Sequence, residues 1–338
     1  MFGGFDAPRQ RIALQRGAFF AEIWPELGGA IARFERRHPF GMRSAVQALF
    51  RSTRQQPRYL PTELASFPLL PYSNRIAEGR FQIGGSSYEL PRNLSGFEHP
   101  LHGIGWIRPW FVLDRQNDRC TLRLVHAGDA DWPCAFTAVQ EIALTESGLE
   151  LKLDLTNSGE QAMPYGIGQH PYIRRPAGTR IFAPVEGVWL SDEQQLPTHR
   201  IALPEQWNLP QGRVFDRCFV DHCFDGLHGD VRVEWPDGSG LRISCSPAMP
   251  FLVVYSVPEH DFVCIEPVSQ RPNAFNAADQ RAAGVAMLEP HQSITVVQRF
   301  DYLPASALRV ITHQRPPNER PQTPGQIAEA DTRALARR

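Results

Sequence analysis

Histidine and carboxylate residues in short motifs have the side-chain types that suit proton transfer. Glu266 lies in the motif CIEP within an otherwise apolar run. Its carboxylate therefore faces either a cleft or a partner, because an unpaired buried charge is costly. His170 lies in GIGQHPYIRRP, and His102 lies in EHPLHGIGWIRPW. Histidine with a carboxylate is a usual combination for moving protons near neutral pH, so the sequence favours general acid/base chemistry.

Each of these residues also has a structural interpretation, which the residue types alone leave open. Glu266 could form a structural ion pair with Arg75, and His170 could be a hydrogen-bonded core histidine. Asp216, in RVFDRCF, could belong to an ordinary loop ion pair. Residue type does not decide between the two interpretations, because structural ion pairs and catalytic pairs use the same groups.

Other kinds of chemistry lack their usual motifs. His99 and His102 are three residues apart, but neither a second ligand pair at zinc-site spacing nor an HExxH motif accompanies them. Cys218 and Cys223 are too far apart for a CxxC knuckle. The chain has no GxSxG motif, and its two Gly-Ile-Gly pairs lack the third glycine of a dinucleotide site. We therefore expect no metal and no cofactor.

The charge balance limits the partners that the chain can bind. Its 338 residues carry 35 basic and 36 acidic side chains, a formal net charge of −1. A protein that binds nucleic acid through phosphate contacts normally has a clear basic excess, and a polybasic membrane anchor needs one too. We therefore expect neither a nucleic-acid nor a membrane partner. Lys152 is the sole lysine, so arginine is the ordinary basic residue here.

The sequence also suggests a compartment. No apolar stretch of about 18 or more residues occurs, and the N-terminal residues MFGGFDAPRQ do not resemble a secretory signal. The six cysteines are scattered without a compact disulfide framework. We expect a cytoplasmic protein, and the composition leaves monomer and homodimer both open.

The segments around these motifs are short runs of alternating apolar and polar residues, separated by Gly, Pro, Asn and Asp. The run 148–155, GLELKLDL, places four leucines on one face, which predicts a half-buried strand. Further strands are predicted in the ranges 81–83, 86–90, 231–235, 241–245, 251–257, 262–268 and 294–300. The best short helix candidate is 41–53. Thirty prolines also favour an all-β fold with few short helices.

The composition changes near residue 304. The segment 304–338 is Pro-rich and charged with few apolar residues. We therefore predict one β-sandwich domain over residues 1–303, followed by a flexible tail over 304–338.

Taken together, the motifs resemble those of the aldose 1-epimerase (galactose mutarotase) family. The matching stretches occur in the family's order and read SNRIAEGRF, HPLHG, GQHPYI, FDRCF, and CIEP followed by PNAFN. Each stretch alone is weak, but five in order are specific. The resemblance implies a large antiparallel β-sandwich, the galactose mutarotase-like supersandwich, that holds a sugar in a cleft across one sheet.

The resemblance also assigns roles to individual residues. Glu266 would be the general base at the anomeric hydroxyl, and His170 the acid that protonates the ring oxygen. His102 would orient or polarise the ring-oxygen region. The sugar hydroxyls would be held by Asn74, Arg75 and Asp216. The implied activity is aldose 1-epimerase, an isomerase that interconverts the α and β anomers of free aldohexoses without a cofactor.

Two departures from the family pattern leave the substrate open. Arg174 and Arg175 follow the histidine motif, and Arg271 follows the glutamate motif. A neutral sugar does not need these arginines, whereas a phosphate ester would accept hydrogen bonds from them. A hexose-6-phosphate 1-epimerase is therefore an alternative. A catalytically silent sugar-binding protein on the same fold is another.

Overall fold

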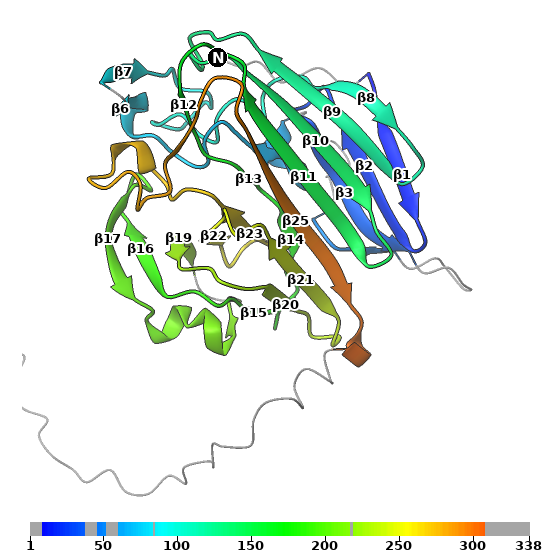
Figure 1. Ribbon diagram of the computed structural model, residues 1–338. Coiled ribbons are helices and arrows are strands. Elements are labelled where there is room, and N and C mark those ends of the chain that lie inside the picture. Colours follow the sequence, from blue (N-terminus) through cyan, green and yellow to red (C-terminus); the bar gives the residue numbers. More distant parts are fainter. Residues whose placement is uncertain (1–8, 38–45, 52–59, 84, 217–218, 308–338) are drawn as a thin grey trace, which may run out of the picture.

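Strands dominate the molecule, as Figure 1 shows for the computed structural model. The structure describes residues 9–37, 46–51, 60–83, 85–216 and 219–307. These residues pair in antiparallel ladders, and their helices are short 3-10 turns and one helical turn at 305–307, so the all-β prediction is confirmed. The helical turns are η1 (Pro61–Glu63), η2 (Ala77–Gly79), η3 (Glu205–Trp207), η4 (Leu209–Gln211) and η5 (Ala274–Asn276).

The longest strands belong to a nine-stranded sheet. Its order is β18 (Arg213–Val214), β15 (Arg180–Phe182), β20 (Val231–Glu234), β21 (Gly240–Cys245), β25 (Ser293–Leu303), β11 (Gly148–Asn157), β10 (Phe136–Leu144), β9 (Arg119–His126) and β8 (Phe111–Arg115). Buried residues alternate with partly exposed ones along β10 and β11. This alternation confirms the half-buried strand predicted at 148–155.

An eight-stranded sheet forms a second layer. Its order is β17 (Pro197–Ala202), β16 (Gly187–Ser191), β19 (Val220–Asp225), β22 (Phe251–Ser256), β23 (Phe262–Val268), β13 (Gly168–Gln169) and β5 (Pro68–Leu69), with β14 (Tyr172–Arg174) also paired to β23. Every residue of β23 is buried. The sheet is therefore covered on both faces at this strand, which accounts for its near-continuous apolar sequence.

Three smaller sheets complete the described part of the chain. They are β1 (Ile12–Arg16), β2 (Phe19–Trp24), β3 (Ala30–Arg37) and β4 (Val46–Ala48); β6 (Arg80–Ile83) with β7 (Ser86–Glu89); and β12 (Met163–Tyr165) with β24 (Ala286–Leu288). The helix prediction for 41–53 is wrong at residues 46–48, because β4 pairs with the end of β3. Residues 41–45 and 52–53 lie outside the described ranges.

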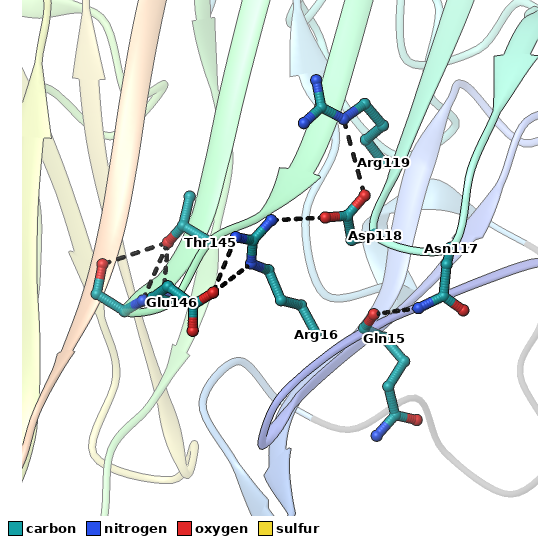
Figure 2. Close-up of polar contacts among 9 residues, drawn as sticks. Gln15, Arg16, Asn117, Asp118, Arg119, Thr145 and Glu146 are labelled. Atoms are coloured by element: carbon teal, nitrogen blue, oxygen red, sulfur yellow. Dashed lines mark hydrogen bonds and ion pairs between the residues drawn. The ribbon is translucent and has the colours of Figure 1, made fainter.

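Arg16 at the end of β1 joins the small sheet to two turns of the nine-stranded sheet (Figure 2). Its guanidinium donates to Asp118, between β8 and β9, at 2.6 Å, and to Glu146, between β10 and β11, at 2.8 Å. The backbone N–H of Gln15 donates to the carbonyl of Asn117 in the same turn as Asp118. These contacts fix the hairpin β1–β2 against the edge of the large sheet.

Buried glutamines connect the layers within an apolar core. Gln169 on β13 donates to the side-chain oxygen of Gln140 on β10 at 2.8 Å, and Gln140 donates to the carbonyl of Gly29. Gln298 on β25 donates to the carbonyl of Pro267 on β23 at 2.7 Å. Because buried polar groups need partners, these bonds fix how the two large sheets lie against each other.

The sheets end at Leu303, where β25 ends. The tail predicted at 304–338 lies outside the described residues from 308 onward, so it stays a prediction. No helix in the described ranges has the length and apolar character needed to cross a membrane.

Candidate active site

A cavity of about 540 Å³ opens on one face of the eight-stranded sheet. That volume falls within the usual range of about 300–1,000 Å³ for small-molecule sites. Its polar and charged lining consists of Arg51, Thr62, Glu63, Asn74, Arg75, His102, His170, Tyr172, Gln195, Asp221, Tyr255, His260 and Glu266. The cavity therefore collects groups from segments that are far apart in the sequence.

Strand pairing sets the floor of this cavity. On β23, Phe262 and Glu266 are four residues apart and both line it, as expected when alternate residues of a strand share a face. Glu266 lies opposite Val253 of β22, and Asp221 of β19 lies opposite Tyr255 of β22. All five side chains line the cavity. The register of three neighbouring strands thus places two carboxylates on one surface.

The structure brings His170 and Glu266 together. The Nε2 atom of His170 lies 3.3 Å from Oε1 of Glu266. The backbone N–H of His170 donates to the carbonyl of Phe67, and the imidazole of His170 stacks on the ring of Phe67 with centroids 4.7 Å apart. His170 is 8% exposed and Glu266 is 2% exposed. The imidazole is held in position by packing and by its own backbone.

Burial affects the two groups in opposite directions. Removal from water raises the pKa of Glu266 well above its ordinary value, with a further contribution from the charge of Asp221. Burial lowers the pKa of His170 to about 3, and the cation of Arg51 adds to this effect. Both shifts disfavour a charged group in a dry site. The pair therefore holds one proton over a wide pH range.

His102 occupies a tight turn beside this pair. Its φ is +62°, and the next residue, Gly103, has φ +68°. A Cβ on Gly103 would lie 2.1 Å from the carbonyl oxygen of Leu70, so only glycine allows this close approach. The ring of His102 lies edge-on to that of His170, with centroids 5.1 Å apart.

One hydrogen bond fixes the tautomer of His102. The backbone N–H of Asn74 donates to Nδ1 of His102 at 3.2 Å, so Nδ1 is the unprotonated nitrogen. Burial lowers the pKa of His102 well below its ordinary value, and the neighbouring His170 and Arg75 lower it further. A neutral ring with Nδ1 as acceptor carries its proton on Nε2 and is therefore a hydrogen-bond donor.

Asn74 and Arg75 lie in a separate segment that pairs with the turn of His102, whose backbone N–H donates to the carbonyl of Asn74. Asn74 has φ +59°, a conformation that asparagine tolerates better than most residues. Its side-chain oxygen accepts from the backbone N–H of Arg75 and from Nη1 of Arg75. Burial lowers the pKa of Arg75, whereas the charges of Asp221 and Glu266 raise it. The guanidinium keeps its charge, and this charge acts to lower the pKa values of Asp221 and Glu266.

Asp216 is not among the residues that line the cavity, and its sugar-binding role stays a prediction. Its carboxylate accepts from the backbone N–H of Gly178 at 2.7 Å and lies 3.9 Å from Arg175. Asp221, five residues later, occupies the cavity instead. Burial raises the pKa of Asp221 to about 6, and Arg75 opposes that shift.

Arg174 and Arg175 also lie away from the cavity lining. Arg175 is 5% exposed, and its guanidinium donates to backbone carbonyls of residues 215, 257, 258, 260 and 262. The guanidinium of Arg174 lies 5.3 Å from the ring centroid of Trp235. Arg271 lies 4.2 Å from the ring centroid of Trp189 and is not part of the lining either. Arg174 and Arg271 therefore pack against tryptophan rings, and Arg175 donates hydrogen bonds to buried backbone carbonyls.

Sequence reasoning missed Arg51 and the aromatic residues Phe67 and Tyr255, which line the cavity. The guanidinium of Arg51 lies 3.6 Å from the ring centroid of Tyr172 and donates to the carbonyls of Thr62 and Leu64. Among the aromatic residues of the motifs, Tyr172 lines the cavity, whereas Trp106 and Trp110 are buried in the core. No sequence signal indicated Arg51, because it reaches the cavity only through the fold.

His99 has a different environment from His102. Its Nδ1 accepts from the backbone N–H of Glu78 at 3.1 Å, and its side chain is 4% exposed. It does not line the cavity. The bond to Glu78 fixes the chain beside the cavity and leaves His99 out of contact with a ligand.

The chain is similar to known proteins over most of its length. The sequence profile of the family described as aldose 1-epimerase matches residues 11–301. The uncharacterized protein YphB of Escherichia coli K12 is 30% identical over 243 residues, which cover 69% of this chain and 82% of YphB. The uncharacterized protein YihR of the same organism is 26% identical over 66% of this chain and 75% of its own length.

Solved structures show the same fold. A protein of Escherichia coli K12, provisionally assigned as an aldose 1-epimerase, superposes with a TM-score of 0.78 at 27% identity, covering 87% of this chain and 98% of its own. A galactose mutarotase-like protein of Clostridium acetobutylicum has a TM-score of 0.75 at 19% identity, covering 86% and 94%. The second likeness concerns the fold alone.

Proposed function

Because the chain belongs to the aldose 1-epimerase family, we propose that it interconverts the α and β anomers of a free aldohexose. The observation that carries this proposal is the buried pair of His170 and Glu266, whose Nε2 and Oε1 atoms lie 3.3 Å apart in the cavity. Anomer exchange requires one proton removed and one delivered, without a change of oxidation state. A carboxylate and an imidazole supply both transfers.

The proposed reaction begins with Glu266 as the proton acceptor. Its carboxylate takes the proton of the anomeric hydroxyl while His170 delivers a proton to the ring oxygen. The bond between C1 and the ring oxygen breaks, and C1 becomes the carbonyl carbon of the open aldehyde. Rotation about C1–C2 presents the other carbonyl face, and the reverse transfers close the ring as the opposite anomer.

The total charge of the pair stays constant through these steps. Before ring opening the pair is an imidazolium beside a carboxylate, and afterwards it is a neutral imidazole beside a carboxylic acid. Both forms have a net charge of zero, so no uncompensated charge develops in the buried site. Burial raises the pKa of Glu266 and lowers that of His170, so the pair rests mainly in its neutral form, and the ion pair from which ring opening starts is the less populated form.

Three further residues would position the sugar. The Nε2–H of His102 is a donor beside His170 and suits the ring-oxygen region. Arg75 supplies a cationic donor, and Asp221 supplies an acceptor for sugar hydroxyls. Asn74 positions two of these residues. Its side-chain oxygen accepts from Nη1 of Arg75, and its backbone N–H donates to Nδ1 of His102. Asp221 thereby takes the role that Asp216 had in the sequence prediction.

One observation favours a second candidate, an aldose that carries an anion such as a hexose 6-phosphate. Arg51 lines the cavity beside Tyr172 and Phe262, with its guanidinium 3.6 Å and 4.8 Å from their ring centroids. A cation there suits an anionic substituent. Glu63 also lines the cavity and opposes such a group. Free aldoses therefore remain the leading proposal.

NMR exchange between anomers of freshly dissolved glucose, galactose, arabinose and glucose 6-phosphate tests the substrate class. Acceleration with the free sugars supports the leading proposal, and acceleration with the phosphate ester alone supports the second candidate. In that case Arg51→Gln should remove the preference. Binding of every sugar without acceleration of any would identify a silent sugar-binding protein and contradict the enzymatic proposal.

A further inference from the structure

We propose that His170, Cys264 and Glu266 form a binding site for a thiophilic divalent cation, with Zn²⁺ as the representative ion, at the floor of the cavity. Their imidazole nitrogen, thiol sulfur and carboxylate oxygen lie within 4.8 Å of one another. All three residues are buried. Nitrogen, sulfur and oxygen are together the ligand set that zinc takes from proteins.

Strand pairing brings these ligand atoms to one place. Cys264 and Glu266 are two residues apart on β23, so both side chains point to the cavity-facing side of the sheet. Cys264 lies between its register partners Tyr172 of β14 and Tyr255 of β22, which both line the cavity. The thiol is therefore on the cavity-facing side of the sheet, behind the residues that line the cavity.

The spacing is close to that of a zinc centre. Zinc lies about 2.0–2.3 Å from its ligand atoms, which places the ligand atoms of a tetrahedral site roughly 3.3–3.8 Å apart. The atoms of His170 and Glu266 are already 3.3 Å apart. The thiol sulfur of Cys264 lies within 4.8 Å of both atoms and would have to move closer to become the third ligand. Three protein ligands leave a fourth position for a water molecule.

The charges at this floor suit a divalent cation. A divalent cation with one thiolate and one carboxylate has a net charge of zero, which suits a buried site. Arg51 and Arg75 oppose a cation at this point, and Asp221 favours it.

Occupancy would remove the proposed proton donor and acceptor together. The cation would therefore inhibit anomer exchange. That consequence rests on the proposed function, whereas the binding itself does not. Cys264 takes no part in the proposed chemistry, so its replacement separates the two.

Titration of the full chain with Co²⁺ tests the binding directly. Coordination by Cys264 should give one equivalent of a thiolate-to-cobalt absorption band in the near ultraviolet, and added Zn²⁺ should displace it. Cys264→Ala should lose the band, and Cys264→Ser offers a second replacement if the alanine variant folds poorly. Cys120→Ala is the matched control, because Cys120 is a buried thiol on β9 in the other large sheet.

The inhibition follows in the same proteins. Zn²⁺ should slow anomer exchange in the wild type, a chelator should restore it, and Cys264→Ala should need at least about tenfold more Zn²⁺. The absence of a cobalt–thiolate band in folded wild type, or its persistence in Cys264→Ala, would overturn the proposal. A band that depends on Cys264 in a protein without mutarotase activity would contradict the proposed function and support the metal site.

Discussion

The Nε2 atom of His170 lies 3.3 Å from Oε1 of Glu266, although the two residues are 96 positions apart in the sequence. Strand β23 and the segment that joins β13 to β14 bring them together, since both β13 and β14 pair with β23. Their close approach makes them one buried unit that holds one proton. Most of the predictions below depend on the groups that surround this unit.

His102 and His99 offer a matched comparison. His102→Asn removes the ring donor but keeps a residue that tolerates the φ of +62°, so the turn should survive. We expect kcat/KM to fall about 10²-fold or more, as is typical for loss of a catalytic proton donor or electrostatic contact. His99→Asn should leave kcat/KM within a few-fold, because His99 does not line the cavity. Equal losses in steady-state assays of the two variants would contradict this distinction.

The two aspartates of the segment RVFDRCFVDHCFDG should differ in the same way. Asp221→Asn loses a charged acceptor in the cavity, and a hydrogen bond to a charged group is worth about 1.5–3 kcal/mol. We therefore expect KM to rise about 10–100-fold. Asp216→Asn changes a carboxylate that bonds the backbone N–H of Gly178, so its KM should be unchanged. A larger KM effect at Asp216 would mean that the sugar lies elsewhere.

Asp221 should also set the acid side of the pH profile. Burial raises its pKa to about 6, so below that pH the carboxyl becomes neutral and loses its attraction for Arg75 and for sugar hydroxyls. The pKa of His170, lowered to about 3, keeps the proton count of the catalytic pair constant in this window. We expect kcat/KM to fall as pH drops through about 6. Asp221→Asn should lack this decline; a wild-type limb that persists in the variant would assign it to another group.

Arg175 should matter for stability alone. Its guanidinium satisfies backbone carbonyls between residues 215 and 262 while the side chain is 5% exposed. Arg175→Met leaves these acceptors without a donor, and each unsatisfied buried group costs about 1–3 kcal/mol. Urea unfolding should show a loss of at least about 2 kcal/mol. KM for sugars in the remaining folded protein should not change, and a selective loss of affinity for glucose 6-phosphate would restore Arg175 as a phosphate contact.

The sequence predicted the strands whose pattern is local. The leucine alternation of β11 and the strands β6 and β7 depend on neighbouring residues only, so both could be predicted. The short strand β4 could not, because three residues carry too little periodicity and β4 forms by pairing with β3. Tertiary pairing decided the structure there.

The candidate site shows the same difference between what local motifs predict and what tertiary pairing decides. Motif order led to Glu266, His170, His102, Asn74 and Arg75, and the structure places all five side chains around one cavity. Asp216 and Asp221 could not be distinguished by type, because the register of β19 against β22, which turns Asp221 inward, follows from tertiary pairing. Arg174, Arg175 and Arg271 posed the same problem, since a guanidinium group can either bind an anion or donate to buried carbonyls.

Anomer exchange in wild type and in Glu266→Gln tests the central claim most directly. Saturation transfer between the α and β anomeric protons of glucose should show enzyme-dependent exchange with the wild type. Glutamine has nearly the same shape but cannot accept the proton, so exchange should fall about 10²–10⁴-fold while the variant unfolds at a similar urea concentration. Near-native exchange in a folded Glu266→Gln protein would contradict the assignment of Glu266 as the base.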